Sequence, residues 1–248
     1  MSLRHALSPS GGAIYHIIAR RRSNTTWRGF RAVVRDWLKS WMTPANAPSP
    51  RDATKELIII GPSAGWTLPL EDFKHLSKIT VVEPDPIARV LLRRRFKAAG
   101  IENSVLEFNA RADLLPWFSS DPSVFTDFLK ARPNAAILFS NVLGQIPLHL
   151  TSAQRSRTLQ ARSEFLAALK DRKWASYHDL FSGSSFESEP LKMSFALASH
   201  EISAESIFTR GDVVDHETSW LSEGRATELA LWPITEKSTH LIGFVSVD

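Results

Sequence analysis

Residues 55–248 alternate between short β-branched runs and longer segments whose apolar residues lie three or four positions apart. The short runs are typical of strands buried on both faces, and the longer segments are typical of helices with one buried side. This alternation predicts a mainly parallel sheet with helical crossovers. Strands are expected at 57–60, 79–82, 104–108, 135–139 and 173–177. Helices are expected at 68–75, 86–100, 123–131 and 152–170.

The C-terminal part predicts a different connection. Residues 228–234 and 240–247 are two β-rich runs, and the polar gap between them, 235–239, is too short for a parallel crossover. An antiparallel hairpin is therefore expected. Residues 182–212 show no clean period, and we expect them to form irregular helices over the sheet edge.

The helix at 86–100 has the clearest local signals. Asp85 is a typical N-cap, Pro86 suits the first helical position, and Gly100 suits the end. The residues expected to point inward are Ile87, Val90 and Leu91. Those expected on a solvated outer face are Arg89, Arg93, Arg94, Arg95 and Lys97.

Residues 1–50 form a separate N-terminal arm. Its apolar residues recur at helical spacing, which predicts a helix with one buried face; they are Trp27, Phe30, Val34, Trp37, Leu38 and Trp41. Asn24 and Thr25 are candidate caps. A second face carries Arg28, Arg31, Arg35 and Lys39, and a docking helix with a solvated basic side is favoured over a nucleic-acid or membrane contact.

A proline-rich stretch at 43–50 ends this helix and reads as a linker. The predicted organisation is therefore an arm with its linker at 1–50 and one Rossmann-like domain at 51–248.

The positive charge of the chain is concentrated in the N-terminal arm. Residues 1–50 hold eight Lys and Arg against Asp36 alone, a net charge of +7, whereas 51–248 holds 22 basic against 25 acidic residues, a net charge of −3. An organelle transit peptide is the alternative reading of such an arm. No apolar run is long enough to cross a bilayer, so a cytoplasmic protein without membrane contact is expected. The absence of cysteine excludes disulfides, thiolate metal sites and cysteine nucleophiles.

The most informative motif joins the first two strands. The run 57–60 leads into Gly61-Pro62-Ser63-Ala64-Gly65-Trp66, and the second strand ends at Glu83. Glycines let the backbone approach a ligand, and an acid at the tip of the next strand can accept hydrogen bonds from ribose hydroxyls. A dinucleotide fold needs glycine where Ser63 and Trp66 stand, and a P-loop needs a lysine that is absent between Gly61 and Asp72. A sulfonium nucleoside, which carries no phosphate, needs neither, while an ordinary strand-to-helix turn is the alternative without a ligand.

With this loop, this acid and the terminal hairpin, residues 55–248 resemble the class I S-adenosylmethionine-dependent methyltransferases, most specifically over 57–145. The resemblance implies an α/β fold: a Rossmann-like doubly wound sheet, mainly parallel, with an antiparallel C-terminal hairpin strand. It implies S-adenosylmethionine as the cofactor. The residues it places around that cofactor are Gly61, Ser63 and Gly65 for the methionine portion, Glu83 for the ribose, Asn109 to Asp113 for the adenine, and Ser140-Asn141 after the fourth strand.

Three residues depart from the pattern of that family. Ser63 replaces the middle glycine, Ile59 stands where an acid is frequent, and Arg111 stands near the usual adenine-binding aspartate. Asn109 or Asp113 are alternatives for that last role.

Candidate catalytic residues follow the fifth strand and precede the hairpin. His178 and Asp179 are expected at the carboxyl end of the fifth strand, where open α/β sheets bind ligands. His216, beside Asp215, is expected to reach the same edge. A histidine or acid satisfied by the backbone is the alternative reading for each. No metal site is expected, because the histidines never recur at ligand spacing on one predicted element.

The leading hypothesis is a methyltransferase whose arm folds over the cofactor and whose acceptor is an unidentified small molecule or RNA. One alternative is a non-catalytic binding module that retains the fold, motivated by Ser63, Ile59 and Arg111. RNA modification is suggested by the basic helix. A knotted methyltransferase is a further alternative, suggested by the Ile-Gly-Pro motif at 60–62. In that class, however, no unit like the Val-Val-Glu-Pro-Asp at 81–85 is expected to follow this motif.

Overall fold

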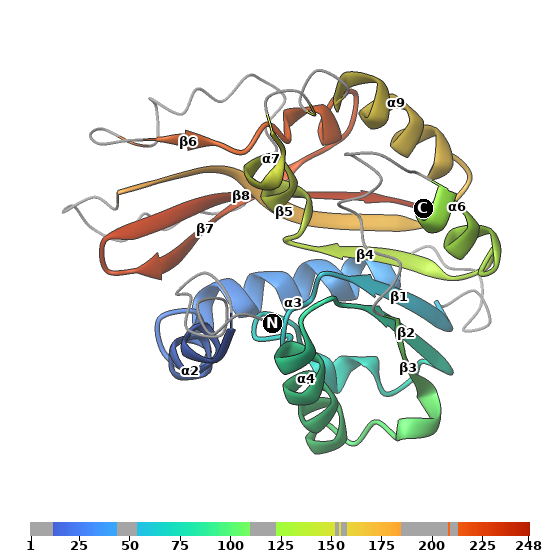
Figure 1. The fold of residues 1–248 in the computed structure, drawn as a ribbon. Coiled ribbons are helices and arrows are strands. Elements are labelled where there is room, and N and C mark those ends of the chain that lie inside the picture. The colour runs from blue at the N-terminus through green and yellow to red at the C-terminus, as the bar shows by residue number, and fades with distance from the viewer. Residues whose placement is uncertain are drawn as a thin grey trace. The chain divides into compact units, whose positions relative to one another are not determined.

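The computed structural model of the 248-residue chain describes residues 12–43, 54–109, 123–151, 154, 158–184, 208 and 213–248. The described residues divide into two compact units, one within Met1–Asp113 and Asp127–Leu138 and the other within Leu114–Thr126 and Phe139–Asp248. Figure 1 shows their elements. Within the described residues, no helix has the length and hydropathy needed to cross a membrane.

Three parallel strands form the core of the first unit. They are β1 (Glu56–Ile60), β2 (Lys78–Val82) and β3 (Leu106–Asn109). Leu57 pairs with Ile79, and Ile79 pairs with Leu106. Four of the five residues in β1 and in β2 are buried, as expected for β-branched runs covered on both faces. The predicted positions of β1 and β2 are therefore confirmed, and β3 begins two residues later than predicted, after the short 3-10 helix η3 (Asn103–Val105).

Helix α4 (Pro86–Ala98) follows β2 and begins as predicted. The Asp85 carboxylate accepts a hydrogen bond from the Ile87 N–H at 2.8 Å, and Pro86 occupies the first turn. The predicted buried face is wrong by one position along the helix. The buried residues are Ala88, Leu92 and Phe96, at intervals of four, whereas Val90 is 54% exposed.

The N-terminal arm contributes two helices to the first unit, α2 (Gly12–Ser23) and α3 (Arg28–Met42). The apolar stripe of α3 is buried as predicted, from Phe30 to Met42. The predicted caps are wrong. The N-cap position is Trp27, without a side-chain hydrogen bond, and the Thr25 hydroxyl instead donates to the carbonyl of Arg21 in α2.

The basic side of α3 makes contacts inside the first unit. Arg35 forms ion pairs with Glu71 and Asp72, and Arg31 donates to the carbonyl oxygen of Ser23 at 3.0 Å. The expected docking role of this helix is thereby supported, because its basic face holds neighbouring elements as well as facing solvent. Both acidic partners lie in η2 (Leu70–Phe73), a short 3-10 helix where a helix at 68–75 was predicted.

Antiparallel strands dominate the second unit. They are β5 (Trp174–Ser184), β7 (Glu228–Thr235) and β8 (Ser238–Val247), with β8 between the other two and antiparallel to both. The predicted hairpin is confirmed. Strand β5 extends seven residues beyond its predicted end at 177, so residues 182–184 are strand rather than irregular helix. The short strand β6 (Val214–Asp215), which pairs with β5, was not predicted.

The remaining elements complete the α/β pattern. Strand β4 (Ala136–Ser140) spans the boundary between the units and confirms the fourth predicted strand. The predicted helix at 123–131 is confirmed as α6, and that at 152–170 is described at Gln154, which is helical, and from Thr158 onward. The helices are α6 (Ser123–Lys130), η4 (Leu143–Gln145), α7 (Ile146–His149), α9 (Thr158–Ala168) and η6 (Ser219–Leu221).

The strand order defines the fold class. In the first unit the order is β3-β2-β1-β4, and in the second it is β4-β5-β8-β7. The first series is the beginning of the order found in doubly wound Rossmann folds. The chain therefore has the predicted α/β fold, mainly parallel in its first strands, with an antiparallel C-terminal pair and a helical N-terminal extension. The division into an arm and a single domain stays a prediction.

The packing of α3 predicts a difference between two adjacent positions. Leu38 is fully buried and Lys39 is exposed. Leu38→Ala should lower the free energy of unfolding by about 2–5 kcal/mol, because it leaves a cavity. Lys39→Ala should change it by less than about 1 kcal/mol, because it removes only a surface ion pair with Asp72. Urea unfolding of both variants measures this, and equally small effects would show that α3 does not pack in the folded chain.

Candidate functional site

The turn after β1 has an uncommon backbone conformation. Gly61, Ser63 and Gly65 have φ angles of 65°, 52° and 66°. This left-handed conformation is readily available to glycine but costs a residue with a Cβ about 1–2 kcal/mol. A Cβ at position 65 would also lie 2.8 Å from Leu92 Cδ1, so glycine allows α4 to approach the loop. Ser63 adopts the same conformation despite its side chain, so its surroundings must hold it there.

The carboxylate of Glu83 holds the loop in this conformation. Its Oε2 accepts a hydrogen bond from the Ser63 N–H at 2.8 Å, and its Oε1 accepts one from the Asp85 N–H at 2.9 Å. The side chain is only 6% exposed. Gly61 adds a backbone bond to the carbonyl oxygen of Val82 at 2.9 Å. The end of β2 and the loop after β1 are therefore joined by a buried acid that contacts both.

Burial changes the acidity of this group. Removal from water raises the pKa of Glu83 to about 7, although the two backbone N–H groups and Arg89 favour the charged form. Arg89 also donates to the carbonyl oxygens of Glu83 and Pro84, at 2.8 and 2.7 Å, and so closes the turn between β2 and α4. Near neutral pH the carboxyl group is thus close to its titration midpoint.

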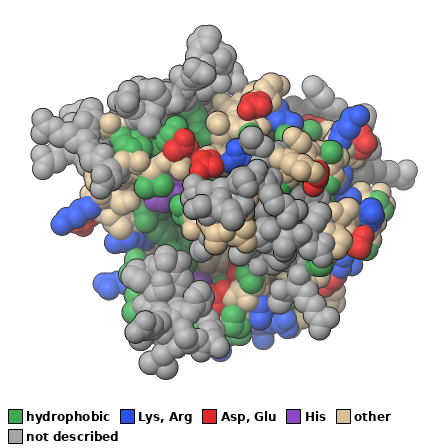
Figure 2. All heavy atoms as spheres, turned by 45° about the horizontal axis from the view of Figure 1, so that its top comes forward, with side chains coloured by type: hydrophobic (Ala, Val, Ile, Leu, Met, Phe, Trp, Pro, Cys, Tyr) green, Lys and Arg blue, Asp and Glu red, His purple; other side chains and the backbone are tan. Residues whose placement is uncertain are grey.

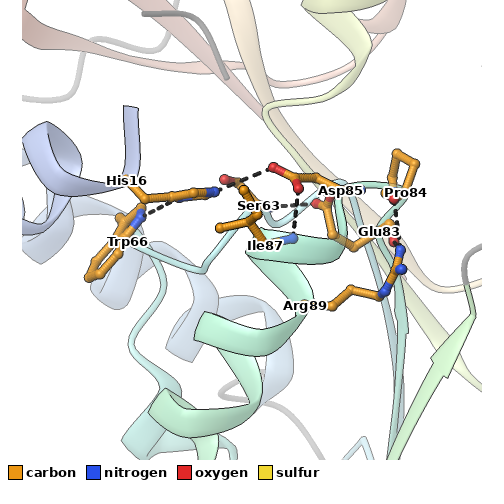
Figure 3. A network of polar contacts seen from close by, with 8 residues as sticks. All are labelled: His16, Ser63, Trp66, Glu83, Pro84, Asp85, Ile87 and Arg89. Carbon is orange, nitrogen blue, oxygen red and sulfur yellow. Dashed lines mark hydrogen bonds and ion pairs between the residues drawn. The ribbon is translucent and has the colours of Figure 1, made fainter. Parts of the chain in front are cut away.

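Helix α2 adds a second polar link, shown in Figure 3. The indole N–H of Trp66 donates to His16 Nδ1 at 3.2 Å, and because an indole can only donate, this nitrogen carries the lone pair. The neutral ring therefore bears its proton on Nε2, which lies 3.4 Å from Asp85 Oδ2. Burial lowers the pKa of His16 despite the nearby acid. The arm is in this way hydrogen-bonded to the loop and to the cap of α4.

Trp66 is held on a second side by Arg95. The Arg95 guanidinium lies 4.6 Å from the centroid of the indole, and it donates to the carbonyl oxygen of Ala64 at 2.6 Å. Burial lowers the pKa of Arg95 to about 10. The prediction of a solvated Arg95 is therefore wrong, because this side chain packs under the loop. Figure 3 shows Trp66 on the α2 side of the loop, directed away from Glu83.

The first unit brings together most of the residues proposed for the cofactor. Gly61, Ser63 and Gly65 form one turn, and Glu83 bonds to it. Asn109 lies at the end of β3, where its carbonyl oxygen accepts the Glu83 N–H at 3.3 Å. Asp113 and Arg111 lie outside the described residues.

The second unit has its own polar cluster, centred on Asp179. This side chain is fully buried, and its Oδ1 accepts from His240 Nδ1 at 2.8 Å. Its Oδ2 accepts from Gln145 Nε2 at 2.6 Å and from Asn141 Nδ2 at 3.2 Å. Asn141, a residue proposed for the cofactor, is therefore bonded to Asp179, a residue proposed for catalysis. Asn141 has a φ of 52°, the left-handed conformation of the loop in the first unit.

His216 borders the same cluster. Its Nδ1 lies 2.8 Å from the carbonyl oxygen of Gly144 and its Nε2 lies 2.9 Å from Ser182 Oγ. A backbone hydrogen bond from its N–H to the carbonyl of Leu180 fixes it beside β5. The hydroxyl of Thr218 bonds to the carbonyl oxygen of Asp179 at 2.6 Å.

His178 faces away from this cluster. Neighbouring residues of a strand point to opposite faces, and both His178 and Asp179 lie inside β5. The expectation that they follow the end of the strand is therefore wrong. His178 is fully buried, contacts Ser176 Oγ through Nδ1 at 3.0 Å, and has its pKa lowered to about 3 by burial. The ring is neutral at ordinary pH, so its surroundings favour the structural alternative over a catalytic one.

Several contacting residues had no sequence signal of their own. His16, Gln145, Thr218 and His240 were not proposed as site residues. Asp85 was proposed only as a helix cap, which it is. Gln145 lies four residues after Asn141, and Thr218 two residues after His216, so neighbouring polar side chains next to a proposed residue were the available signal.

Comparisons with known proteins gave structural matches only. No family model and no curated protein matches the chain. A SAM-dependent methyltransferase from Anabaena variabilis is 11% identical, with 94% of this chain and 92% of that one covered and a TM-score of 0.47.

Two further solved structures are magnesium protoporphyrin IX methyltransferase from Synechocystis with bound SAM and the methyltransferase domain of bacterial CtHen1. The first is 10% identical over 92% of this chain and 84% of its own, with a TM-score of 0.46. The second is 12% identical over 90% and 100%, with a TM-score of 0.44. Likeness at this level carries no information on activity, and the fold is established by the strand order and pairing described above.

The loop conformation predicts opposite effects of two small substitutions. Ser63→Gly should leave the free energy of unfolding unchanged or raise it by about 1 kcal/mol, because glycine relieves the left-handed strain. Gly65→Ala should lower it by about 2–4 kcal/mol, because it introduces both that strain and a clash with Leu92. Urea denaturation compares the two, and a loss of stability in Ser63→Gly equal to that in Gly65→Ala would contradict the described turn.

The raised pKa of Glu83 predicts a pH-dependent stability. Its folded-state pKa of about 7 exceeds the ordinary value of 4.5. Between pH 4.5 and about pH 7, the carboxyl group is therefore protonated in the folded state and ionised in the unfolded state. The resulting contribution of Glu83 to the free energy of unfolding is complete below about pH 4.5 and is lost as the pH rises through about 7. Its size is on the order of 3 kcal/mol.

Chemical denaturation from pH 4 to pH 8 of wild type and Glu83→Gln measures this contribution as the difference between the two profiles. Because the amide does not titrate, stability should fall more steeply with pH in the wild type than in the variant. Parallel profiles would show that Glu83 has an ordinary pKa.

Proposed function

We propose that this chain is an S-adenosylmethionine-dependent methyltransferase. The observation that carries the proposal is the buried Glu83 carboxylate bonded to the left-handed Gly61–Gly65 loop, at the carboxyl ends of two adjacent parallel strands. Open α/β sheets bind ligands at this edge. A carboxylate at the tip of the second strand is suited to accept hydrogen bonds from the two hydroxyls of a ribose.

The hydrogen bonds of this loop argue against a phosphate-containing ligand. A pyrophosphate is normally held by backbone N–H groups of such a loop. Here the Ser63 N–H already donates to the Glu83 carboxyl group, so it is not available to a phosphate. Asp85 adds a second carboxylate at the start of α4. A nucleoside that carries a sulfonium, positively charged and without phosphate, is electrostatically compatible with these acids.

The residues available for each part of the cofactor are those that the resemblance implies. Gly61, Ser63 and Gly65 would hold the methionine portion, Glu83 the ribose, and Asn109 the adenine. The bound cofactor would supply an activated methyl group. Methyl transfer depends mainly on alignment, and a base is needed only where the acceptor must lose a proton. We propose a small molecule or an RNA as the methyl acceptor. Of the three predicted catalytic residues, Asp179 and His216 remain candidates.

The basic helix gives weak support to an RNA acceptor. Arg31 and Arg35 both form contacts within the first unit, which leaves them less available to phosphates. Figure 2 shows Lys and Arg side chains interspersed with Asp and Glu on the face in view. A small-molecule acceptor is therefore favoured.

One observation favours a second candidate, a non-catalytic module that retains the fold. Both oxygens of Glu83 already accept backbone hydrogen bonds, and the side chain is almost completely buried. In this alternative the acid serves only to fix the loop. Each carboxylate oxygen can accept more than one hydrogen bond, so ribose binding is chemically compatible with the same geometry.

Binding of S-adenosylhomocysteine tests the proposal by isothermal titration calorimetry. Wild type should bind, and Glu83→Ala should weaken binding by about 10-fold to 100-fold through loss of charged hydrogen bonds to the ribose. The matched control is Glu102→Ala, an exposed acid at the N-cap position of η3, which should bind as wild type does.

Absence of binding to folded wild type at millimolar ligand would overturn the methyltransferase proposal and favour the non-catalytic module. Circular dichroism of each variant separates loss of binding from loss of fold.

A further inference from the structure

We propose that Asp179, His216 and His240 form a binding site for a divalent transition-metal ion. The three side chains place one ligand atom each within 4.8 Å of one another. The site lies entirely in the second unit and does not depend on the loop that carries the proposed methyl donor.

Three separate segments supply these residues. Asp179 belongs to β5, His216 directly follows β6, and His240 belongs to β8. The backbone pairing of β8 with β5 places His240 opposite Ser182, and the His216 N–H bonds to the carbonyl of Leu180. All three side chains are therefore positioned by strand pairing, the rigid kind of support that a metal site requires.

His216 is oriented as metal-binding histidines are. Its Nδ1 contacts the carbonyl oxygen of Gly144, which can only accept, so Nδ1 carries the proton and Nε2 carries the lone pair. A backbone carbonyl that fixes the tautomer in this way is the usual partner of a metal-bound imidazole. The lone pair now accepts a hydrogen bond from Ser182 Oγ, which lies 2.9 Å away and can rotate. The ring is 2% exposed, and its centroid lies 5.9 Å from that of the His240 ring.

The charge of Asp179 is the second argument. The side chain is 0% exposed, and the hydrogen-bond donors of Gln145 and Asn141 are neutral amides. Among the described residues, no Lys or Arg forms an ion pair with it, and His240 is the one ionisable side chain that is hydrogen-bonded to it. Buried charges are normally paired or coordinated to metal ions. A cation between Asp179 and the two imidazoles would compensate this charge.

The donor set indicates the class of ion. Two imidazole nitrogens and one carboxylate oxygen suit Zn²⁺, Co²⁺ or Fe²⁺, whereas Mg²⁺ and Ca²⁺ prefer oxygen ligands alone. Three protein ligands leave at least one coordination position for water or a substrate oxygen, the arrangement of catalytic rather than structural sites.

Metal binding changes only one hydrogen bond around the acid. His240 Nδ1 now bonds to Asp179 Oδ1 at 2.8 Å. If this nitrogen binds the metal, its proton moves to Nε2, for which the described residues contain no hydrogen-bond partner. The imidazole keeps one proton and stays neutral, and the carboxylate exchanges a hydrogen bond for the metal.

Titration of the metal-free full-length protein with Co²⁺ and with Zn²⁺ tests the proposal. Co²⁺ should give a visible absorption band with one equivalent bound, and calorimetry with Zn²⁺ should give the same stoichiometry. His240→Gln and His216→Gln should each weaken Zn²⁺ binding by about 100-fold or more, since each removes a direct ligand. The matched control is His75→Gln, an exposed histidine in the first unit that should leave the affinity unchanged.

We use histidine variants and leave Asp179 unchanged, because His240 is 19% exposed and its replacement should disturb the fold less than replacement of the buried Asp179. Circular dichroism confirms that each variant is folded. Absence of metal binding to wild type, or binding that persists when both histidines are replaced together, would overturn the proposal and leave Asp179 and His240 as a simple hydrogen-bonded pair. None of these measurements uses a methyl donor, so the result is independent of the S-adenosylhomocysteine titration.

Discussion

The hydrogen bonds of Glu83 are the constraint on which the first unit depends. A carboxylate at the end of β2 accepts one backbone N–H from the loop after β1 and another from the turn before α4. Its burial would be costly without these partners, and Ser63 would have little reason to take a left-handed conformation without the acid. Each unfavourable feature is stabilised by the other. A local arrangement of this kind, strained and electrostatically specific, is more typical of binding sites than of ordinary turns.

The sequence predicts the first unit well because its signals are local. The β-branched runs of β1 and β2 are typical of buried strands, and the Asp85-Pro86 pair is a local signal for the start of α4. The buried face of α4 was misplaced because Val90 and Leu91 are as apolar as Leu92, and the approach of Leu92 to Gly65 has no local signal in the sequence. Helix α2 was missed because its polar and apolar residues form no stripe.

The second unit was harder to predict because its decisive contacts are between distant residues. The predicted end of β5 was too early, because the mostly polar segment 178–184 resembles a loop. Its pairing with β8, a distant segment, makes it a strand. The cluster around Asp179 could not be recognised from ligand spacing, because its histidines come from different strands. The absence of a histidine motif on any one element therefore did not bear on metal binding. Asp179 and His216 were selected from the sequence as catalytic candidates, a role that stays a prediction, and their hydrogen-bond partners were not predicted.

The order of the strands also has a consequence for how the protein is made. Strand β8 lies between β5 and β7, although it is the last of the three to leave the ribosome. Until it emerges, β5 lacks that neighbour and Asp179 lacks His240. The nascent chain thus carries an unpaired strand edge, which favours association with other chains or with chaperones. The turn around Glu83 joins Ser63, Glu83 and Asp85, which are all synthesised early, whereas the Asp179 cluster is completed late in biosynthesis.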